Sequence, residues 1–246
     1  MFVAVFCFLA SVASAGVGTG PEFNNPRGTA LDGDSDFVFA DFASGNILRV
    51  DGKTGARTMV SDSSDTNLGP PLSAPAGIVV LADKRIFVSD INLRAVIEIN
   101  RDTGKRTVVT AKGAFKTPFG IASGPVTGGK EMLVITDTGS DDKGNVVGPV
   151  IVDPDDGKVT YIVRAADETI NFNDPRAVAV NGRDIYSGNL GAGMIIHTDP
   201  SSGKRKIVSL NPDPQSKKAA LEKVSRLAIS MILESPKMAS FFLPPI

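Results

Sequence analysis

One unit of roughly 50 residues recurs four times along this chain. Every copy opens on a proline with a glycine or alanine two residues later, ends its second apolar run on Asp or Asn, and then reaches a hairpin that contains a glycine. The opening tripeptides are Pro26-Arg27-Gly28, Pro75-Ala76-Gly77, Pro118-Phe119-Gly120 and Pro175-Arg176-Ala177. Because the same landmarks return in the same order, we predict a repeat protein in which each unit packs on the next.

The copy at Pro75–Thr110 shows what one unit contains. Its second run alternates, with Ile86 and Val88 directed to one face and Phe87 to the other, which is the period of a β-strand. The hairpin that follows the third run predicts a left-handed conformation at Gly104. Four short antiparallel strands cannot bury both of their faces alone. The predicted fold class is therefore all-β, a β-propeller of four-stranded antiparallel blades.

The repeat divides the chain into a leader, a propeller and a tail. Residues 1–15 read as a signal peptide, because Phe2–Ala10 is a short apolar core and Ala13-Ser14-Ala15 is a small-residue cleavage site. Residues 16–210 form the propeller, with blades at 26–61, 75–110, 118–164 and 175–210. We expect a secreted, extracellular protein without disulfides, since the single cysteine, Cys7, lies in the leader. No later segment is apolar enough to span a membrane.

The tail, residues 211–246, admits two interpretations. Ser225-Arg226-Leu227-Ala228-Ile229 resembles the opening of the fourth blade and continues the period, so an incomplete fifth blade could start there. We favour a C-terminal helix over Gln215–Leu233, because this segment lacks turn residues and its apolar residues follow helical spacing. These residues are Ala220, Val224, Leu227, Ala228, Met231 and Ile232. Since an unclosed ring would expose a blade edge and an apolar face, we hypothesise a shortened version of a larger propeller, which could also form oligomers.

Composition limits the partners. A formal net charge of −1 gives no support for a nucleic acid or an anionic membrane as the partner. The chain has one histidine and no tryptophan, which leaves few imidazole or indole groups for function.

At these landmarks the chain resembles the six-bladed propellers of the NHL-repeat, gluconolactonase (senescence-marker) and virginiamycin B lyase-like type. The shared residues are the Pro-x-Gly openings, the Phe-Val-x-Asp strand ends and the glycine hairpins, over roughly Asn25–Leu210. This resemblance implies a family that includes calcium-dependent lactone and ester hydrolases, lyases and non-catalytic binding scaffolds. In the hydrolases, several calcium ligands precede the glycine of the blade-opening turn. The corresponding residues here, Arg27, Ala76, Phe119 and Arg176, cannot donate an oxygen to calcium.

Three sets of residues are candidates for a functional site. Asp41, Asp90, Asp137 and Asn189 end the second strands and would converge at one end of a central channel, either as acceptors for backbone N–H groups of the adjacent turns or as an oxygen-lined ligand pocket. Asp137, Asp141 and Asp142 form a weak candidate for a metal site. His197 is the sole candidate for the catalytic histidine that the lyase resemblance implies, but no motif surrounds it. The basic residues Lys105, Arg106, Lys204, Arg205 and Lys206 are interpreted as a solvated rim.

Two functions of different class are compatible with these residues. We favour a secreted binding or scaffold protein that presents its loops and central channel to a protein, a carbohydrate or a small polar ligand. The alternative is a hydrolase (lactonase or esterase) that uses calcium as its cofactor, or a lyase, acting in the central channel.

Overall fold

The computed structural model describes residues 18–140, 146–162 and 168–211. The first sheet contains β1 (Pro26–Asp32), β2 (Asp36–Asp41), β3 (Ile47–Val50) and β4 (Arg57–Ser61). The second contains β5 (Pro75–Val80), β6 (Ile86–Asp90), β7 (Ala95–Ile99) and β8 (Arg106–Val108), after a short 3₁₀ helix, η1 (Thr66–Leu68). The third contains β9 (Pro118–Gly124), β10 (Met132–Ser140), β11 (Val146–Val152) and β12 (Val159–Tyr161). The fourth contains β13 (Pro175–Asn181), β14 (Asp184–Asn189), β15 (Met194–Thr198) and β16 (Arg205–Leu210).

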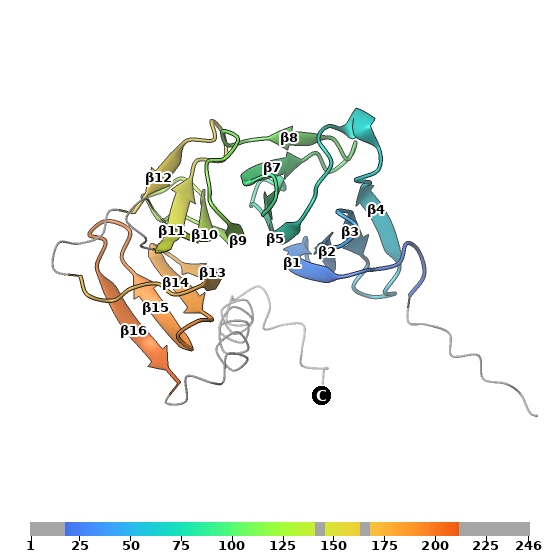
Figure 1. Cartoon of the computed structure of the whole chain (residues 1–246). Helices are drawn as coiled ribbons and strands as arrows, with labels where there is room; N and C mark the ends of the chain where they lie inside the picture. Colours follow the sequence, from blue (N-terminus) through green and yellow to red (C-terminus); the bar gives the residue numbers. More distant parts are fainter. Residues whose placement is uncertain (1–17, 141–145, 163–167, 212–246) are drawn as a thin grey trace, which may run out of the picture.

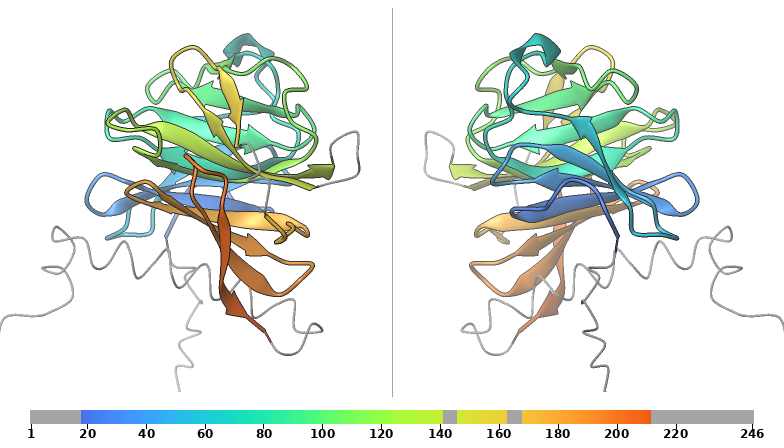
Figure 2. Two further views of the ribbon diagram at one scale, coloured as in Figure 1. Left: turned by 90° about the vertical axis from the view of Figure 1, so that its left-hand side faces the viewer. Right: turned by 90° about the vertical axis from the view of Figure 1, so that its right-hand side faces the viewer.

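Each sheet is an antiparallel meander, in which every strand pairs with the next one along the chain. The four sheets lie side by side along an arc, with β1, β5, β9 and β13 on its inner side and β4, β8, β12 and β16 on its outer side (Figure 1). The side views show that each sheet is twisted (Figure 2). This architecture confirms the predicted fold class, an all-β propeller built from four-stranded blades.

The hydrophobic core lies between the blades rather than within any one of them. Ile86 and Val88 of the second blade pack into a cluster with residues of the first blade, whereas Phe87 packs into a cluster with residues of the third. A further cluster joins Val134 of β10 to Ile185 of β14. Every residue of β6 is buried, because both of its faces are covered by neighbouring blades. The alternation in the sequence therefore records two buried faces, as expected for a unit that stacks on copies of itself.

The glycine of the opening tripeptide allows the innermost strands to approach one another. A Cβ atom added to Gly28 would lie 2.9 Å from the backbone nitrogen of Ile78. One added to Gly77 would lie 2.7 Å from the backbone oxygen of Phe119, and one added to Gly120 would lie 2.6 Å from that of Arg176. Real Cβ contacts are not this short, so the motif is required by packing between blades. At the equivalent place the fourth blade has Ala177.

A β-bulge accompanies each of these openings. In the second blade, the hydroxyl of Ser89 accepts a hydrogen bond from the amide of Gly77 (3.1 Å) and donates one to the carbonyl of Phe119 in the third blade (2.5 Å). In the third blade, Thr136 bridges Gly120 and Arg176 in the same way. The hydroxyl thus satisfies an amide that the bulge removes from the ladder, and it links two blades.

The interpretation of Arg106 as part of a solvated rim is wrong. Its side chain is buried, with 2% of the residue exposed. Its guanidinium donates hydrogen bonds to the carbonyl oxygens of Asp62, Asp65, Gly69 and Pro70 and to the hydroxyl of Ser61. Burial lowers the pKa of Arg106, but an arginine remains charged at that burial. The residue therefore anchors the connector between the first two blades. Arg205 is half-buried as well, with its guanidinium 4.1 Å from the centre of the Phe172 ring, whereas Lys105, Lys204 and Lys206 are exposed as expected.

Several predictions concern residues outside the described part of the chain. The signal peptide at 1–15, the metal candidates Asp141 and Asp142, and the helix or fifth blade in the tail all lie there. Within the described residues, no helix is both long and apolar enough to cross a membrane. The left-handed conformation expected at Gly104 is present, with φ of 71°.

Replacing Gly77 by alanine tests the packing of the innermost strands. The added methyl group would meet the carbonyl of Phe119 and the side chain of Ile121, so we expect the free energy of unfolding to fall by about 1–3 kcal/mol. Urea denaturation measures the change. The matched control is Ala76→Ser at the adjacent half-buried position, where we expect less than about 0.5 kcal/mol. Equal stability of Gly77→Ala and the native protein would contradict this role for the glycine.

Candidate functional site

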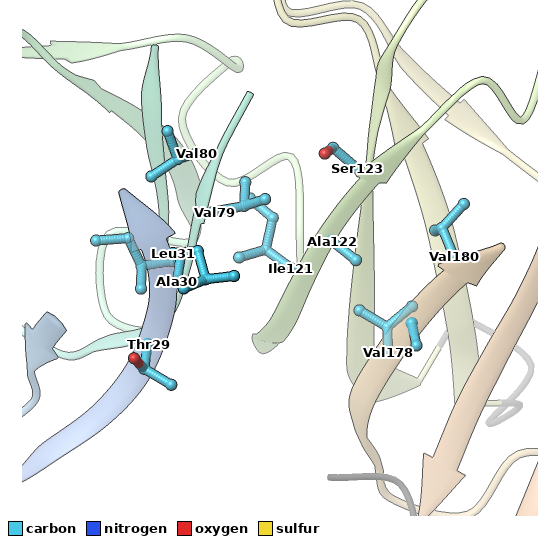
Figure 3. Close-up of a pocket in the computed structure, with 12 residues that line it drawn as sticks. Thr29, Ala30, Leu31, Val79, Val80, Ile121, Ala122, Ser123, Val178 and Val180 are labelled. Carbon is cyan, nitrogen blue, oxygen red and sulfur yellow. The ribbon is translucent and has the colours of Figure 1, made fainter. Parts of the chain in front are cut away.

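A cavity of about 410 Å³ lies between the innermost strands of all four blades. Figure 3 shows its lining, with side chains from β1 and β5 facing those from β9 and β13. The lining residues are Thr29, Ala30, Leu31, Ile78, Val79, Val80, Ile121, Ala122, Ser123, Val178, Ala179 and Val180. The repeat produces this cavity, because each blade contributes the same three positions of its first strand.

The side chains that line the cavity are mostly apolar. Among its lining residues only Thr29 and Ser123 have polar side chains, and none has an ionisable one. The hydroxyl of Ser123 is already bonded to the carboxylate of Glu131 (2.7 Å). Such a wall can bury aliphatic groups of a ligand, but it offers no general acid or base for a proton transfer.

The predicted strand-end residues occupy equivalent places and are buried. Asp90 shows the pattern: one carboxylate oxygen accepts hydrogen bonds from the amides of Ser73 (2.8 Å) and Ala74 (3.0 Å), and the other accepts from Asn92 (3.0 Å) and Leu93 (2.9 Å). The first pair of amides belongs to the connector that enters the blade, and the second pair to the turn after β6. Asp90 therefore ties the start of its own blade to the end of the second strand.

The other three members of this set make the same kind of contact. Asp137 accepts from the amides of Lys116, Thr117 and Gly139, at 2.7–3.1 Å. Asn189 has one amide acceptor bond, from Asn173 (3.1 Å), and its NH₂ group donates to Ser187. These contacts agree with the first of the two interpretations given above, in which the strand-end residues accept hydrogen bonds from the backbone N–H groups of the adjacent turns. Ligand binding by Asp41, Asp90, Asp137 or Asn189 stays a prediction, and none of the four lines the cavity.

Asp41 shows what these bonds do to a carboxylate. Its oxygens accept from the amides of Asn24 (2.5 Å), Asn25 (3.0 Å) and Ser44 (3.2 Å). Burial by itself would raise the pKa of Asp41, but the bonds from these three amides outweigh burial and hold the pKa below its usual value of 3.8. The group is therefore charged in the folded protein at neutral pH, and its charge is stabilised by backbone dipoles.

His197 has an orienting carboxylate that the sequence analysis did not find. Its Nε2 lies 2.8 Å from a carboxylate oxygen of Asp184, and its ring lies 5.2 Å from that of Tyr186. Tyr186 is directly opposite His197 in the ladder between β14 and β15. The cross-strand register of the hairpin is the signal that could have identified Asp184. His197 lies on the third strand of its blade and is not one of the residues that line the cavity.

The positions implied as calcium ligands do not fit a metal ion. The guanidinium of Arg27 lies 3.6 Å from the centre of the Phe42 ring, and that of Arg176 lies 4.4 Å from the centre of the Phe119 ring. Ala76 has no donor atom. Among residues 18–140, 146–162 and 168–211, no group of three His, Cys, Asp or Glu side chains is placed to hold a metal ion. Cation–aromatic pairs thus occupy the places that oxygen ligands would need.

The sequence matches no protein-family model, and no curated protein matches it. Solved structures resemble it in fold. Virginiamycin B lyase from Staphylococcus aureus aligns at 14% identity with a TM-score of 0.57, over 77% of this chain and 57% of that chain. A streptogramin B lyase aligns at 13% identity with a TM-score of 0.60, over 80% of this chain and 59% of the lyase.

A third structure is the extracellular domain of a putative one component system from B. thetaiotaomicron, at 14% identity and a TM-score of 0.52, over 78% of this chain and 24% of that one. This chain therefore spans 57% and 59% of the two lyases it resembles. At these identities the likeness shows the β-propeller fold.

Substituting Asp41 by asparagine tests the strand-end contacts through their pH dependence. Because the folded-state pKa is depressed, the carboxylate contributes stability above pH 3.8, and this contribution is lost as the pH falls through the lower folded-state pKa. We expect Asp41→Asn to lower the free energy of unfolding at pH 7 by about 1–3 kcal/mol, and the difference from the native protein to shrink below pH 4. Urea melts at pH 7 and pH 3 measure it.

The control is Asp34→Asn in the exposed turn after β1, for which we expect no measurable difference at pH 7. A deficit of Asp41→Asn that is the same at both pH values would contradict the role of the charged form.

Proposed function

We propose that this chain is a secreted binding module that holds a segment of another protein in the cavity between its innermost strands. The observation that carries the proposal is the cavity itself, about 410 Å³ in volume and lined almost entirely by aliphatic side chains from four blades. Ligand pockets typically have volumes of about 300–1,000 Å³ and mostly apolar walls. The volume suits a few apolar side chains of a peptide segment rather than a folded domain.

The chemistry of the walls favours a protein segment over a carbohydrate or a small polar ligand. A sugar buried here would depend on the backbone groups of the strand edges for most of its hydrogen bonds, because only Thr29 and Ser123 offer polar side chains, and every hydroxyl left unpaired would cost free energy. An aliphatic side chain has no such cost and gains from its removal from water. The apolar lining thus supports a protein partner.

The extracellular setting rests on two further observations. The first 15 residues have the pattern of a signal peptide, and one of the similar structures is itself an extracellular domain. Both support secretion as part of the proposal.

Selection of peptides from a random displayed library tests the proposed function. We expect the enriched peptides to share clusters of Leu, Ile, Val or Phe, and Thr29→Arg to weaken their binding at least tenfold, because the longer, charged side chain would enter the cavity. Thr29 is exposed, so the substitution should leave the fold intact. The matched control is Thr107→Arg on the outer strand β8, which should bind as the native protein does.

Absence of enriched peptides would overturn the proposal. Equal binding by Thr29→Arg and Thr107→Arg would also overturn it, because the peptides would then be held elsewhere.

The calcium-dependent hydrolase is separated from the binding module by a thermal melt. Calcium at about 100 times its dissociation constant would add roughly 2.7 kcal/mol to the free energy of unfolding. We expect the melting temperature in millimolar calcium to equal that in chelator, since Arg27, Ala76, Phe119 and Arg176 offer no oxygen ligands. A clear rise in calcium would instead favour the hydrolase and would direct the search to lactone and ester substrates.

A further inference from the structure

The fourth blade has a face with no neighbouring blade among the described residues. Ile185 of β14 points toward the third blade, where it packs with Val134 and Ile151. Successive residues of a strand point to opposite faces, so Tyr186 and its cross-strand partner His197 point away from the third blade. We call the surface that carries Tyr186, His197, Ala177, Ala179 and Ile195 the trailing face.

The equivalent faces of the first three blades are covered by the next blade. Val38, Phe87 and Val134, which hold the place of Tyr186, have no exposed surface. In the described residues β13–β16 has strands of the third blade on one side and no strand on the trailing face (Figure 1). Ile195 and Ala179 nevertheless have only 4% and 7% of their surface exposed. The trailing face is therefore apolar at its centre.

The fourth blade lacks the glycine that lets the next blade approach in the first three blades. In the first three blades the approach of the next innermost strand requires glycine, because a Cβ atom there would lie 2.6–2.9 Å from backbone atoms of that strand. The fourth blade has Ala177 at this place, so a next strand at the same spacing would meet its Cβ atom.

We propose that residues 215–233 of this chain cover the trailing face as an amphipathic helix, in place of a fifth blade. In this segment Ala220, Val224, Leu227, Ala228, Met231 and Ile232 recur at the spacing of one helix face, whereas Ile229 falls on the opposite face. Asp213-Pro214 before it matches the residues preferred at the cap and first position of a helix. A helix packs through its side chains and keeps its backbone away from the sheet, so it tolerates the methyl group of Ala177.

The exit of the chain from β16 places this segment within reach. The amide of Asn211 donates to the carbonyl of Gly193 (2.9 Å), which immediately precedes β15, so the described part of the chain ends at the edge of the fourth blade, next to the start of β15. Residues 212–214 can span about 10 Å. A helix over 215–233 would be about 28 Å long, enough to cross four strands spaced about 4.8 Å apart.

Crosslinking in a cysteine-free background tests the proposal. The full chain with Cys7→Ser would carry Tyr186→Cys together with Val224→Cys, or together with Ile229→Cys as the matched control, and be treated with a short bismaleimide. We expect intrachain crosslinking of the Val224 pair to be at least tenfold faster than that of the Ile229 pair. Mass spectrometry of the crosslinked peptides identifies the products.

The proposal would be overturned by equal rates for the two pairs, by no crosslink in either, or by crosslinks between chains. Crosslinks between chains would indicate a second copy on the trailing face.

A second measurement does not depend on cysteines. We expect Val224→Asp to lower the melting temperature by about 5 °C and Ile229→Asp to leave it unchanged, since a charge on the buried side of the helix is costly. Equal melting temperatures of the two variants would again overturn it.

Discussion

The close approach of successive innermost strands is the constraint on which the rest of the structure depends. It brings the backbone of one blade into contact with that of the next at Gly28, Gly77 and Gly120, where no side chain fits. Two other features follow from this spacing. The apolar clusters form between blades because the sheets are close enough to interdigitate, and the bulge beside each glycine leaves an amide that a hydroxyl or the adjacent backbone must satisfy.

Buried polar residues of the repeat stabilise the connectors that join one blade to the next. Asp90 and its equivalents accept hydrogen bonds from the amides of the connectors that enter each blade. Arg106 donates hydrogen bonds to the carbonyls of the connector before the second blade. Both kinds of side chain are buried, and both are surrounded by backbone groups of the opposite polarity. They thus stabilise irregular segments, which lack the backbone hydrogen bonds of a sheet. These contacts explain why a set of equivalent buried Asp and Asn residues need not be a metal site.

The candidate binding site of the protein is the cavity between the innermost strands, whose side chains are mostly apolar. Since the first strands carry small and aliphatic residues at their inner positions, the cavity they enclose is suited to aliphatic groups. The likeness to two lyases at 13–14% identity shows the fold, and Arg27 and Arg176, at two of the positions that the resemblance implies as calcium ligands, form cation–aromatic pairs. The binding of a protein segment that we propose agrees with these walls.

The sequence by itself determined the repeat, the four-stranded blades, the hairpin glycines and the place of Asp41, Asp90, Asp137 and Asn189 at the strand ends, because local periodicity and turn chemistry are written in neighbouring residues. Only the tertiary structure decided that Arg106 is buried, that Asp184 is the partner of His197, and that the cavity is apolar. These features depend on cross-strand register and on contacts between blades. Residues far apart in the chain make such contacts, and no local pattern specifies them.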